Sequence, residues 1–371
     1  MTERPTLAVG LMSGTSLDGM DAALVRFTDP THVTLLAFAT RAYSDPERAR
    51  IRAVLDGGGA RESALLHASL AVWAGDAVQA ALDAGRTLAS QLSFISFSGQ
   101  TIWHEPPEVS WQLGEPAILA EQFGVPVVNN FRARDVAAGG QGAPLVPVAD
   151  VLLFGGDAPR VLLNIGGMAN VTYVKRRAIE DGAFAFDTGP GMAVIDAVAR
   201  MVDPSATCDL DGAISSRGKP NEPLLQELLA DPFFAAAPPK STGRERFGDS
   251  YARRIHDRAP GPDAVATAVE LTARSIASAI GRWAPVAREI VVSGGGAHHP
   301  GLLRSLGAAL AAASPGGHTL RRFDELFFDG DAKEAVAFAL LGYLTMHGQP
   351  ANLPAATGAA GARVLGAITP A

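Results

Sequence analysis

Near its start the chain reads Gly10-Leu11-Met12-Ser13-Gly14-Thr15-Ser16-Leu17-Asp18-Gly19-Met20-Asp21, a segment that joins apolar runs at residues 7–9 and 22–25. Two apolar runs joined by a glycine-rich segment are typical of a β-hairpin. The glycines permit positive φ and let an anion approach the main chain, while the hydroxyl side chains supply donors. Asp18 and Asp21 carry carboxylates suited to a hard cation. The segment predicts a hairpin whose turn holds phosphate, with a place for Mg²⁺ beside it.

A turn of this kind also occurs in hairpins without a ligand, so the segment alone leaves a structural role open. A second strand-turn-strand pattern spans residues 161–174, with Gly166 and Gly167 in its turn. This echo of the first hairpin predicts two related halves. A third glycine turn, at residues 294–296, ends an apolar run and precedes a helical pattern. Three such turns at strand ends predict a nucleotide site in a cleft, although the Gly-x-x-x-x-Gly-Lys-Ser/Thr phosphate loop is absent.

The composition limits the classes of protein that fit. A chain of 371 residues, 47% hydrophobic and 19% charged, is long enough for about two globular domains. A net charge of −7 without a dense basic cluster argues against a nucleic-acid partner. One cysteine, Cys208, rules out an internal disulfide, and the longest apolar stretch, at 335–346, is too short to span a bilayer. We therefore expect a cytoplasmic protein with no membrane partner.

Asp187 is the candidate catalytic base. It follows the apolar run 183–186 and begins the turn Asp187-Thr188-Gly189-Pro190-Gly191, after which a helical pattern starts. A carboxylate at a strand end that faces a cleft suits proton abstraction. The alternative is that Asp187 only caps the helix. We favour the base, because Thr188 can serve as the cap and phosphoryl transfer needs an activated acceptor.

Four polar residues on strand-end loops are candidate substrate contacts: Gln100, Thr101, Arg132 and Asp135. Arg132 has the bidentate geometry that clamps a carboxylate. An equally good alternative is that Arg132 pairs with Asp135 and pins a domain crossing in the glycine-rich stretch 135–147. Glu334, at the start of the last helical pattern, is either a helix N-terminal charge or a further substrate contact. The histidines lack metal-ligand spacing, so no transition metal is expected.

Taken together, the motifs resemble those of the anhydro-N-acetylmuramic acid kinases, a family within the actin, sugar kinase and Hsp70-type ATPase superfamily. The resemblance runs through nearly the whole chain. Beyond the three glycine turns it includes Ser98-Gly99-Gln100-Thr101-Ile102-Trp103-His104, the stretch 135–147, Asp187 to Gly191, Pro239 to Glu245, Lys333 to Phe338, and Asn352-Leu353-Pro354 with Thr357-Gly358-Ala359.

The resemblance implies an α/β fold of two actin-like domains, of the ribonuclease-H-like type, with mixed β-sheets flanked by helices and a central cleft. The domains would be 1–132 with about 346–371, and 133–345, with nucleotide and sugar between them. It implies an ATP- and Mg²⁺-dependent enzyme of cell-wall recycling. This enzyme opens the ring of 1,6-anhydro-N-acetylmuramic acid with water and phosphorylates O6, giving N-acetylmuramic acid 6-phosphate and ADP. A homodimer is implied as well.

The resemblance also distributes the roles of the site residues. Asp187 would activate water, Arg132 and Glu334 would contact the sugar together with Gln100, Thr101 and Asp135, and Asp18 and Asp21 would hold the metal. The nucleotide would be bound by Gly14, Thr15, Ser16, Leu17, Asp18, Gly19, Met20, Asp21, Gly166, Gly167, Gly294, Gly295 and Gly296.

Two features depart from what such a comparison predicts. Met192 stands where the family usually has Asn, and Met12 stands where other sugar kinases of the superfamily often have Asp. The second departure is normal for this family, but it leaves open whether Asp18 and Asp21 contact the metal directly or through water. Alternative functions are a kinase for another anhydro or amino sugar, and a non-catalytic, chaperone-like ATPase of the same fold.

Overall fold

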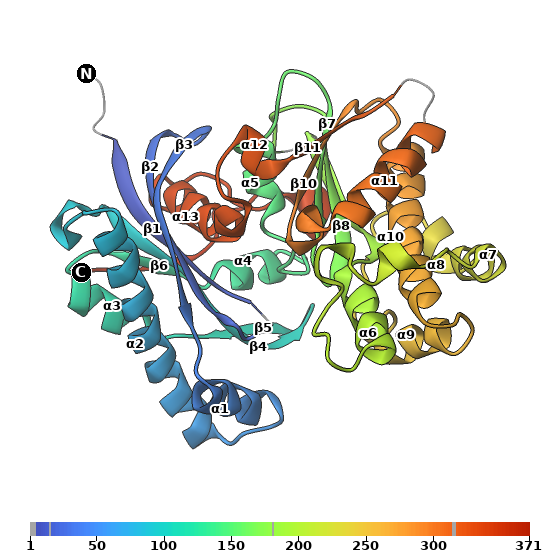
Figure 1. Cartoon of the computed structure of the whole chain (residues 1–371). Coiled ribbons are helices and arrows are strands. Elements are labelled where there is room, and N and C mark those ends of the chain that lie inside the picture. Colours follow the sequence, from blue (N-terminus) through green and yellow to red (C-terminus); the bar gives the residue numbers. More distant parts are fainter. Residues whose placement is uncertain (1–4, 15, 180–181, 314–316) are drawn as a thin grey trace. The chain divides into compact units, whose positions relative to one another are not determined.

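The computed structural model describes residues 5–14, 16–179, 182–313 and 317–371. By the contacts within it, the chain divides into two compact units. The first comprises Met1–Phe154 and Asp331–Ala371, and the second comprises Gly155–Arg177 and Gly182–Gly330. Each unit contains its own mixed β-sheet and its own layer of helices (Figure 1). The structure is therefore α/β, as the sequence predicts.

The sheet of the first unit has the order β12-β6-β4-β1-β2-β3, and β5 pairs with β4. β1, β2 and β3 form an antiparallel meander, whereas β4 and β6 lie parallel to β1. The predicted first hairpin is β1 and β2, joined by the glycine-rich turn. The bounds are β1 Thr6–Ser13, β2 Gly19–Asp29, β3 His32–Ala42, β4 Phe94–Glu105, β5 Val109–Leu113, β6 Val127–Asn129 and β12 Ala367–Thr369.

The sheet of the second unit repeats this arrangement, with the order β11-β10-β7-β8-β9. Again the first three strands are an antiparallel meander, and the next two lie parallel to the first of them. The two related halves predicted from the paired glycine hairpins are confirmed by this shared topology. The bounds are β7 Arg160–Ile165, β8 Met168–Val174, β9 Ala183–Pro190, β10 Glu289–Ser293 and β11 Thr319–Arg322.

Helices cover both faces of the first sheet, with α2 and α13 on opposite sides (Figure 1). This explains why β1 and β2 read as continuous apolar runs instead of alternating ones. Gly10 of β1 is required for packing, because a Cβ there would lie 2.0 Å from the carbonyl oxygen of Ala335 in α13. The bounds are α1 Asp45–Leu55, α2 Ala60–Ala84, α3 Pro116–Phe123, α4 Phe131–Ala137, α5 Pro147–Leu152, α13 Lys333–Met346 and α14 Pro354–Thr357.

α2 is long and apolar enough to cross a membrane by length and composition alone. However, 56% of its most apolar window is buried, and Leu66, Leu70 and Trp73 pack into the core with β1, β2 and β4. This is how a core helix of a globular domain behaves.

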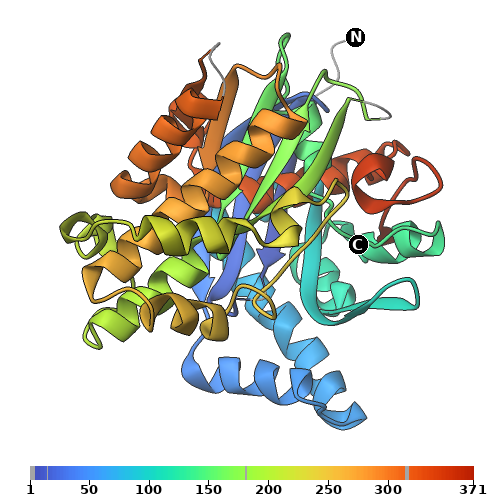
Figure 2. The ribbon, with the colours of Figure 1, turned by 90° about the vertical axis from the view of Figure 1, so that its right-hand side faces the viewer.

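The core of the second unit lies between its sheet and a layer of helices, in which α10 packs against α6, α9 and α11. Figure 2 looks onto this layer, coloured from yellow-green to orange. The bounds are α6 Met192–Val202, α7 Glu222–Leu229, α8 Pro232–Ala235, α9 Asp249–His256, α10 Pro262–Trp283, α11 Pro300–Ala313 and α12 Phe323–Leu326, and the short 3-10 turns of both units are Ala89–Gln91, Leu210–Gly212, Ser215–Arg217, Gly295–His298 and Gly330–Ala332.

These units differ from the sequence-based division at 132/133 and 345/346. Residues 133–154 and helix α13 belong to the first unit, and the chain passes between units near Phe154 and near Asp331. Two contacts hold these segments there: Lys333 pairs with Asp150 at 2.8 Å, and Asn352 donates to Asp135 at 2.7 Å. The glycine-rich stretch 138–144 is thus folded onto its own unit.

Candidate active site

A cluster of buried polar side chains holds the turn after β1 in place through hydrogen bonds. The Ser13 hydroxyl contacts the Tyr43 hydroxyl at 2.8 Å and donates to Gln100 Oε1 at 2.5 Å. Gln100 is fully buried and donates through Nε2 to the carbonyl oxygen of Gly14 at 3.3 Å. Burial raises the pKa of Tyr43 to about 12, so its hydroxyl stays neutral. Gln100, predicted as a substrate contact, therefore fixes the phosphate-binding turn in this structure.

Within the turn the side chains fold back onto the main chain. Asp18 Oδ1 accepts from the Ser16 hydroxyl at 2.8 Å and from the Gly19 N–H at 3.0 Å. Leu17 is buried and has φ 58°, an unusual conformation for leucine that the surrounding contacts impose. Thr15, one of the predicted nucleotide contacts, lies outside the described residues.

Acidic side chains gather beside this turn. Burial is the largest cause of the raised pKa of Asp21, and repulsion from Asp18 and Asp331 adds to it, while a bond from the Thr40 hydroxyl opposes it. Asp331 was not found from the sequence, although the acidic pattern of Asp331 and Glu334 before the last apolar helix was a signal.

These carboxylates fit a magnesium ion that keeps most of its water. Among the described residues the hydrogen bonds to Asp18 and Asp21 all involve Oδ1, which leaves Oδ2 of each for a cation. In the described part of the chain no group of three or more His, Cys, Asp or Glu side chains is arranged around a metal position. Mg²⁺ often has only one or two protein carboxylates, with water and phosphate as the other ligands.

Arg132 and Glu334, 202 positions apart in the sequence, share one electrostatic environment. Burial lowers the pKa of Arg132, and the charge of Glu334 opposes this shift. Burial is also the main cause of the raised pKa of Glu334, which Lys333 and Arg132 counteract and Asp21 reinforces. Glu334 as a residue is nevertheless exposed, so a ligand can reach it. The first unit thus brings the half-buried guanidinium of Arg132 together with two carboxylates, those of Glu334 and Asp21.

The hairpin of β4 and β5 presents a polar face near Arg132. His104 Nδ1 lies 2.9 Å from the Ser110 hydroxyl, and Gln112 Nε2 lies 3.4 Å from Thr101 Oγ1. Burial and the charge of Arg132 lower the pKa of His104, so this imidazole is neutral at pH 7. His104 is a hydrogen-bonding residue, as the absence of metal-ligand spacing indicated.

Asp187 lies on β9 in the second unit, and its carboxylate is held by the main chain. Oδ2 accepts from the Thr242 N–H at 2.8 Å, and the Asp187 N–H donates to the Lys240 carbonyl at 3.0 Å. Burial raises the pKa of Asp187, Glu245 raises it further, and Thr242 and Lys240 oppose the rise. The sequence placed Asp187 after a strand, but β9 continues through Pro190 because Asp187 to Pro190 still pair with β8. A carboxyl group with a raised pKa is suited to general base catalysis.

The helix-capping alternative for Asp187 is not what the structure shows. Helix α6 begins at Met192 with Gly191 as its N-cap, and no side chain caps it. The hydroxyl of Thr188 does not cap the helix either, because it donates to the Ala169 carbonyl at 3.1 Å. The carboxylate of Asp187 is therefore available for another role.

The two glycine turns of the second unit lie side by side at the end of β7. A Cβ on Gly294, which has φ 78°, would lie 2.6 Å from Asn164 Oδ1, and a Cβ on Gly296 would lie 2.4 Å from Ile165 Cγ2. Gly295 faces open space. Gly166 and Gly167 accept the first N–H groups of α6, including that of Met192 at 2.8 Å. The backbone can approach a ligand closely at both turns.

Arg244 is a candidate that the sequence reading missed. Its Nη2 would lie 3.9 Å from a Cβ on Gly167, so a guanidinium borders the second glycine turn. The signal was its place in the segment Pro239 to Glu245, which the resemblance already included.

A model of the family described as Anhydro-N-acetylmuramic acid kinase matches residues 6–371. The chain belongs to the anhydro-N-acetylmuramic acid kinase family. It is 43% identical over 380 residues to the "Anhydro-N-acetylmuramic acid kinase" of Xanthomonas axonopodis pv. citri, covering 98% of both chains. It is 42% identical over 383 residues to that of Gloeobacter violaceus, covering 99% of both. Among solved structures, a ROK hexokinase from Thermus thermophilus aligns with a TM-score of 0.42 and 15% identity, over 92% of this chain and 99% of the other.

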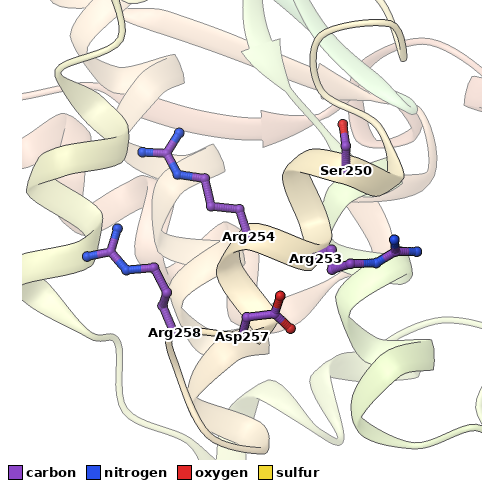
Figure 3. Close-up of a pocket in the computed structure, with 5 residues that line it drawn as sticks. All are labelled: Ser250, Arg253, Arg254, Asp257 and Arg258. Carbon is purple, nitrogen blue, oxygen red and sulfur yellow. The ribbon is translucent and has the colours of Figure 1, made fainter.

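The chain is therefore a kinase of the anhydro-N-acetylmuramic acid kinase family. The glycine turns and Asp187 are its candidate site residues. A surface hollow of about 400 Å³ elsewhere in the second unit does not contain these residues. Figure 3 shows its lining, which is Ser250, Arg253, Arg254, Asp257 and Arg258. Arg254 and Arg258 are paired with Glu227, so this hollow offers little unpaired positive charge.

Proposed function

We propose that this enzyme converts 1,6-anhydro-N-acetylmuramic acid, ATP and water into N-acetylmuramic acid 6-phosphate and ADP, as part of peptidoglycan recycling and amino sugar catabolism. The observation that carries the proposal is the environment of Asp187. Its carboxylate is half-buried, oriented by the Thr242 N–H and free of a capping role, and its pKa is raised.

The reaction requires one proton acceptor and one phosphate-binding surface. Asp187 takes a proton from water as the water oxygen bonds to the anomeric carbon. The bond from that carbon to O6 breaks, and O6 takes its electron pair to the γ-phosphorus of ATP. The bond from the γ-phosphorus to the bridging oxygen breaks, and ADP leaves. Asp187 acts on water, so a sugar hydroxyl is not its proton donor.

The other residues bind and orient. The turn 14–19 and the turn at Gly166 and Gly167 would hold the phosphates through backbone N–H groups. The turn 294–296 would border the adenosine. Mg²⁺ beside Asp18 and Asp21 would neutralise charge on the transferring phosphates.

The sugar would be held by side chains of the first unit. Arg132, which is half-buried, would pair with the lactyl carboxylate, because a guanidinium binds carboxylates bidentately. The Glu334 carboxylate would accept hydrogen bonds from sugar hydroxyls, and the Thr101 hydroxyl would donate or accept one. The resemblance to the family also underlies our proposals that the enzyme is cytoplasmic and homodimeric, which cell fractionation and sedimentation test.

Turnover of four sugars separates this function from its nearest alternative. The enzyme should phosphorylate 1,6-anhydro-N-acetylmuramic acid far faster than N-acetylmuramic acid, N-acetylglucosamine or levoglucosan. If the first sugar is not turned over, the proposed substrate is wrong and the enzyme acts on another sugar. ADP release that does not depend on any sugar would favour the chaperone-like ATPase.

A further inference from the structure

Asp135 is a fully buried carboxylate whose three hydrogen-bond donors come from two separate segments of the first unit, the one around Gly142 and the C-terminal segment 352–357. Oδ1 accepts from Asn352 Nδ2 at 2.7 Å and from Thr357 Oγ1 at 2.8 Å. Oδ2 accepts from the Gly142 N–H at 2.8 Å. Among the described residues no lysine, arginine or histidine pairs with it. Neutral donors alone therefore stabilise this buried charge, and each of them matters.

The backbone of Gly142 continues this chain of contacts to Arg132. Its N–H donates to Asp135, and its carbonyl accepts from Arg132 Nη1 at 2.8 Å. Close packing restricts the peptide further, because a Cβ on Gly142 would lie 3.3 Å from Arg132 Cβ, and one on Gly140 would lie 2.3 Å from Asp135 Oδ2. Gly142 also has φ 68°, a conformation that favours glycine. The N–H of this one glycine is held by a carboxylate, and its carbonyl orients a guanidinium.

The alternative in which Arg132 and Asp135 form an ion pair is not realised. The two side chains instead bond to the same residue, Arg132 to the carbonyl oxygen of Gly142 and Asp135 to its N–H. The carboxylate of Asp135 is occupied by three donors and buried, which leaves it poorly placed to meet a substrate.

We propose that Asp135 is a positioning residue, and that it acts with Asn352 and Thr357 through Gly142 to aim Arg132 at the carboxylate of the substrate. The C-terminal segment 352–357 thereby sets the preference for an acidic sugar over a neutral one. The inference rests on the proposed function, in which Arg132 binds that carboxylate.

The test compares two buried threonines that lose the same hydroxyl. Thr357→Val removes a donor to Asp135, whereas Thr345→Val removes a donor to the Leu341 and Leu365 carbonyls and leaves Asp135 untouched. Both threonines are buried. The readout is the ratio of kcat/KM for 1,6-anhydro-N-acetylmuramic acid to that for 1,6-anhydro-N-acetylglucosamine, which lacks the carboxylate. A loss of packing alone changes both values together, but misaiming of Arg132 changes the ratio.

Thr357→Val should lower this ratio about tenfold, through a higher KM for the acidic sugar, because one hydrogen bond to a charged group is lost. Thr345→Val should leave the ratio within about twofold, and Thr357→Ser, which keeps the hydroxyl, should restore it. Asp135→Asn provides a second variant should Thr357→Val not fold. Its amide must place an NH₂ group against either Gly142 or the donors on Oδ1, so the ratio should fall as well.

Arg132→Gln separates a failure of this inference from a failure of the proposed function. A wild-type enzyme that prefers the acidic sugar, loses the preference in Arg132→Gln and keeps it in Thr357→Val and Asp135→Asn would overturn the positioning role and leave the function intact. A wild-type enzyme without the preference would overturn both.

Discussion

The carboxylate of Asp187 accepts a hydrogen bond of 2.8 Å from the backbone N–H of Thr242. This bond joins the middle of β9 to the segment Pro239 to Glu245, two regions more than fifty positions apart. It fixes the orientation of one carboxylate oxygen, while burial raises the pKa of the group. A base that is both oriented and more basic than a free aspartate is what the proposed activation of water needs.

Replacing Asp187 by Asn should abolish sugar phosphorylation while nucleotide still binds. The amide keeps the shape but cannot take a proton, so we expect kcat to fall by about 10²–10⁴-fold. ATP binding, measured by calorimetry, should change little. Asp196→Asn is the matched control, because Asp196 on α6 also has a pKa raised by burial and has no assigned role in the site. Normal turnover in Asp187→Asn would show that the base is another group.

The acid limb of the pH profile should move in opposite directions in two variants. Activity needs ionised Asp187, so it falls as pH drops through the pKa of this group. The charge of Glu245 raises that pKa and the charge of Lys240 lowers it. Glu245→Gln should therefore shift the limb of kcat/KM to lower pH, and Lys240→Met should shift it to higher pH. Limbs that stay in place in both variants would show that a different group titrates.

Gly294→Ala should destabilise the second unit and weaken ATP binding. Its φ of 78° and ψ of 174° suit only glycine, and the new Cβ would lie 2.6 Å from Asn164 Oδ1. We expect a loss of about 1–3 kcal/mol in the free energy of unfolding. Gly307→Ala, in helix α11 with open space around the new Cβ, should not destabilise the protein. Denaturant titration compares the two, and equal stability would contradict the role given to Gly294.

Asp21→Asn should raise the Mg²⁺ concentration needed for half-maximal activity. It removes one of the two carboxylates proposed to hold the ion, and the bond from Thr40 involves only one of its oxygens. Asp29→Asn, on an exposed part of β2, is the control. The measurement is a Mg²⁺ titration of turnover at saturating ATP. An unchanged midpoint in Asp21→Asn would remove this residue from the metal site.

Breaking the Lys333–Asp150 pair should destabilise the first unit strongly. Both side chains are almost fully buried, at 8% and 4% exposure, so Lys333→Met would leave a buried carboxylate without its cation. We expect a loss of about 3–5 kcal/mol. The exposed Arg254–Glu227 pair should contribute less than about 1 kcal/mol. Similar losses in Lys333→Met and Arg254→Met, measured by denaturant titration, would contradict this account.

The sequence predicted those features that are local. Glycine turns between apolar runs located both hairpins, and their similarity predicted the repeated topology of the two sheets. Asp187 stood out because a carboxylate and a glycine-proline pair follow an apolar run in the chain, and its role as the base stays a prediction.

Features that depend on distant segments were not predictable in this way. The unit boundaries depend on Asn352 and Thr357 folding back onto Asp135, and no local pattern reports such a contact. For the same reason Gln100 and Asp135 looked like substrate contacts, although burial makes them supports of a turn and of Arg132. Asp331 and Arg244 are site candidates only because the fold brings them close to Asp21 and Gly167.

The most direct test of the central claim is the structure of the product. Phosphorus and proton NMR spectra of a reaction with 1,6-anhydro-N-acetylmuramic acid, ATP and Mg²⁺ should show the phosphate coupled to the C6 protons, free anomeric proton signals of the opened ring, and one ADP per sugar consumed. A phosphorylated sugar that keeps its anhydro ring, or phosphate on any oxygen other than O6, would contradict the account.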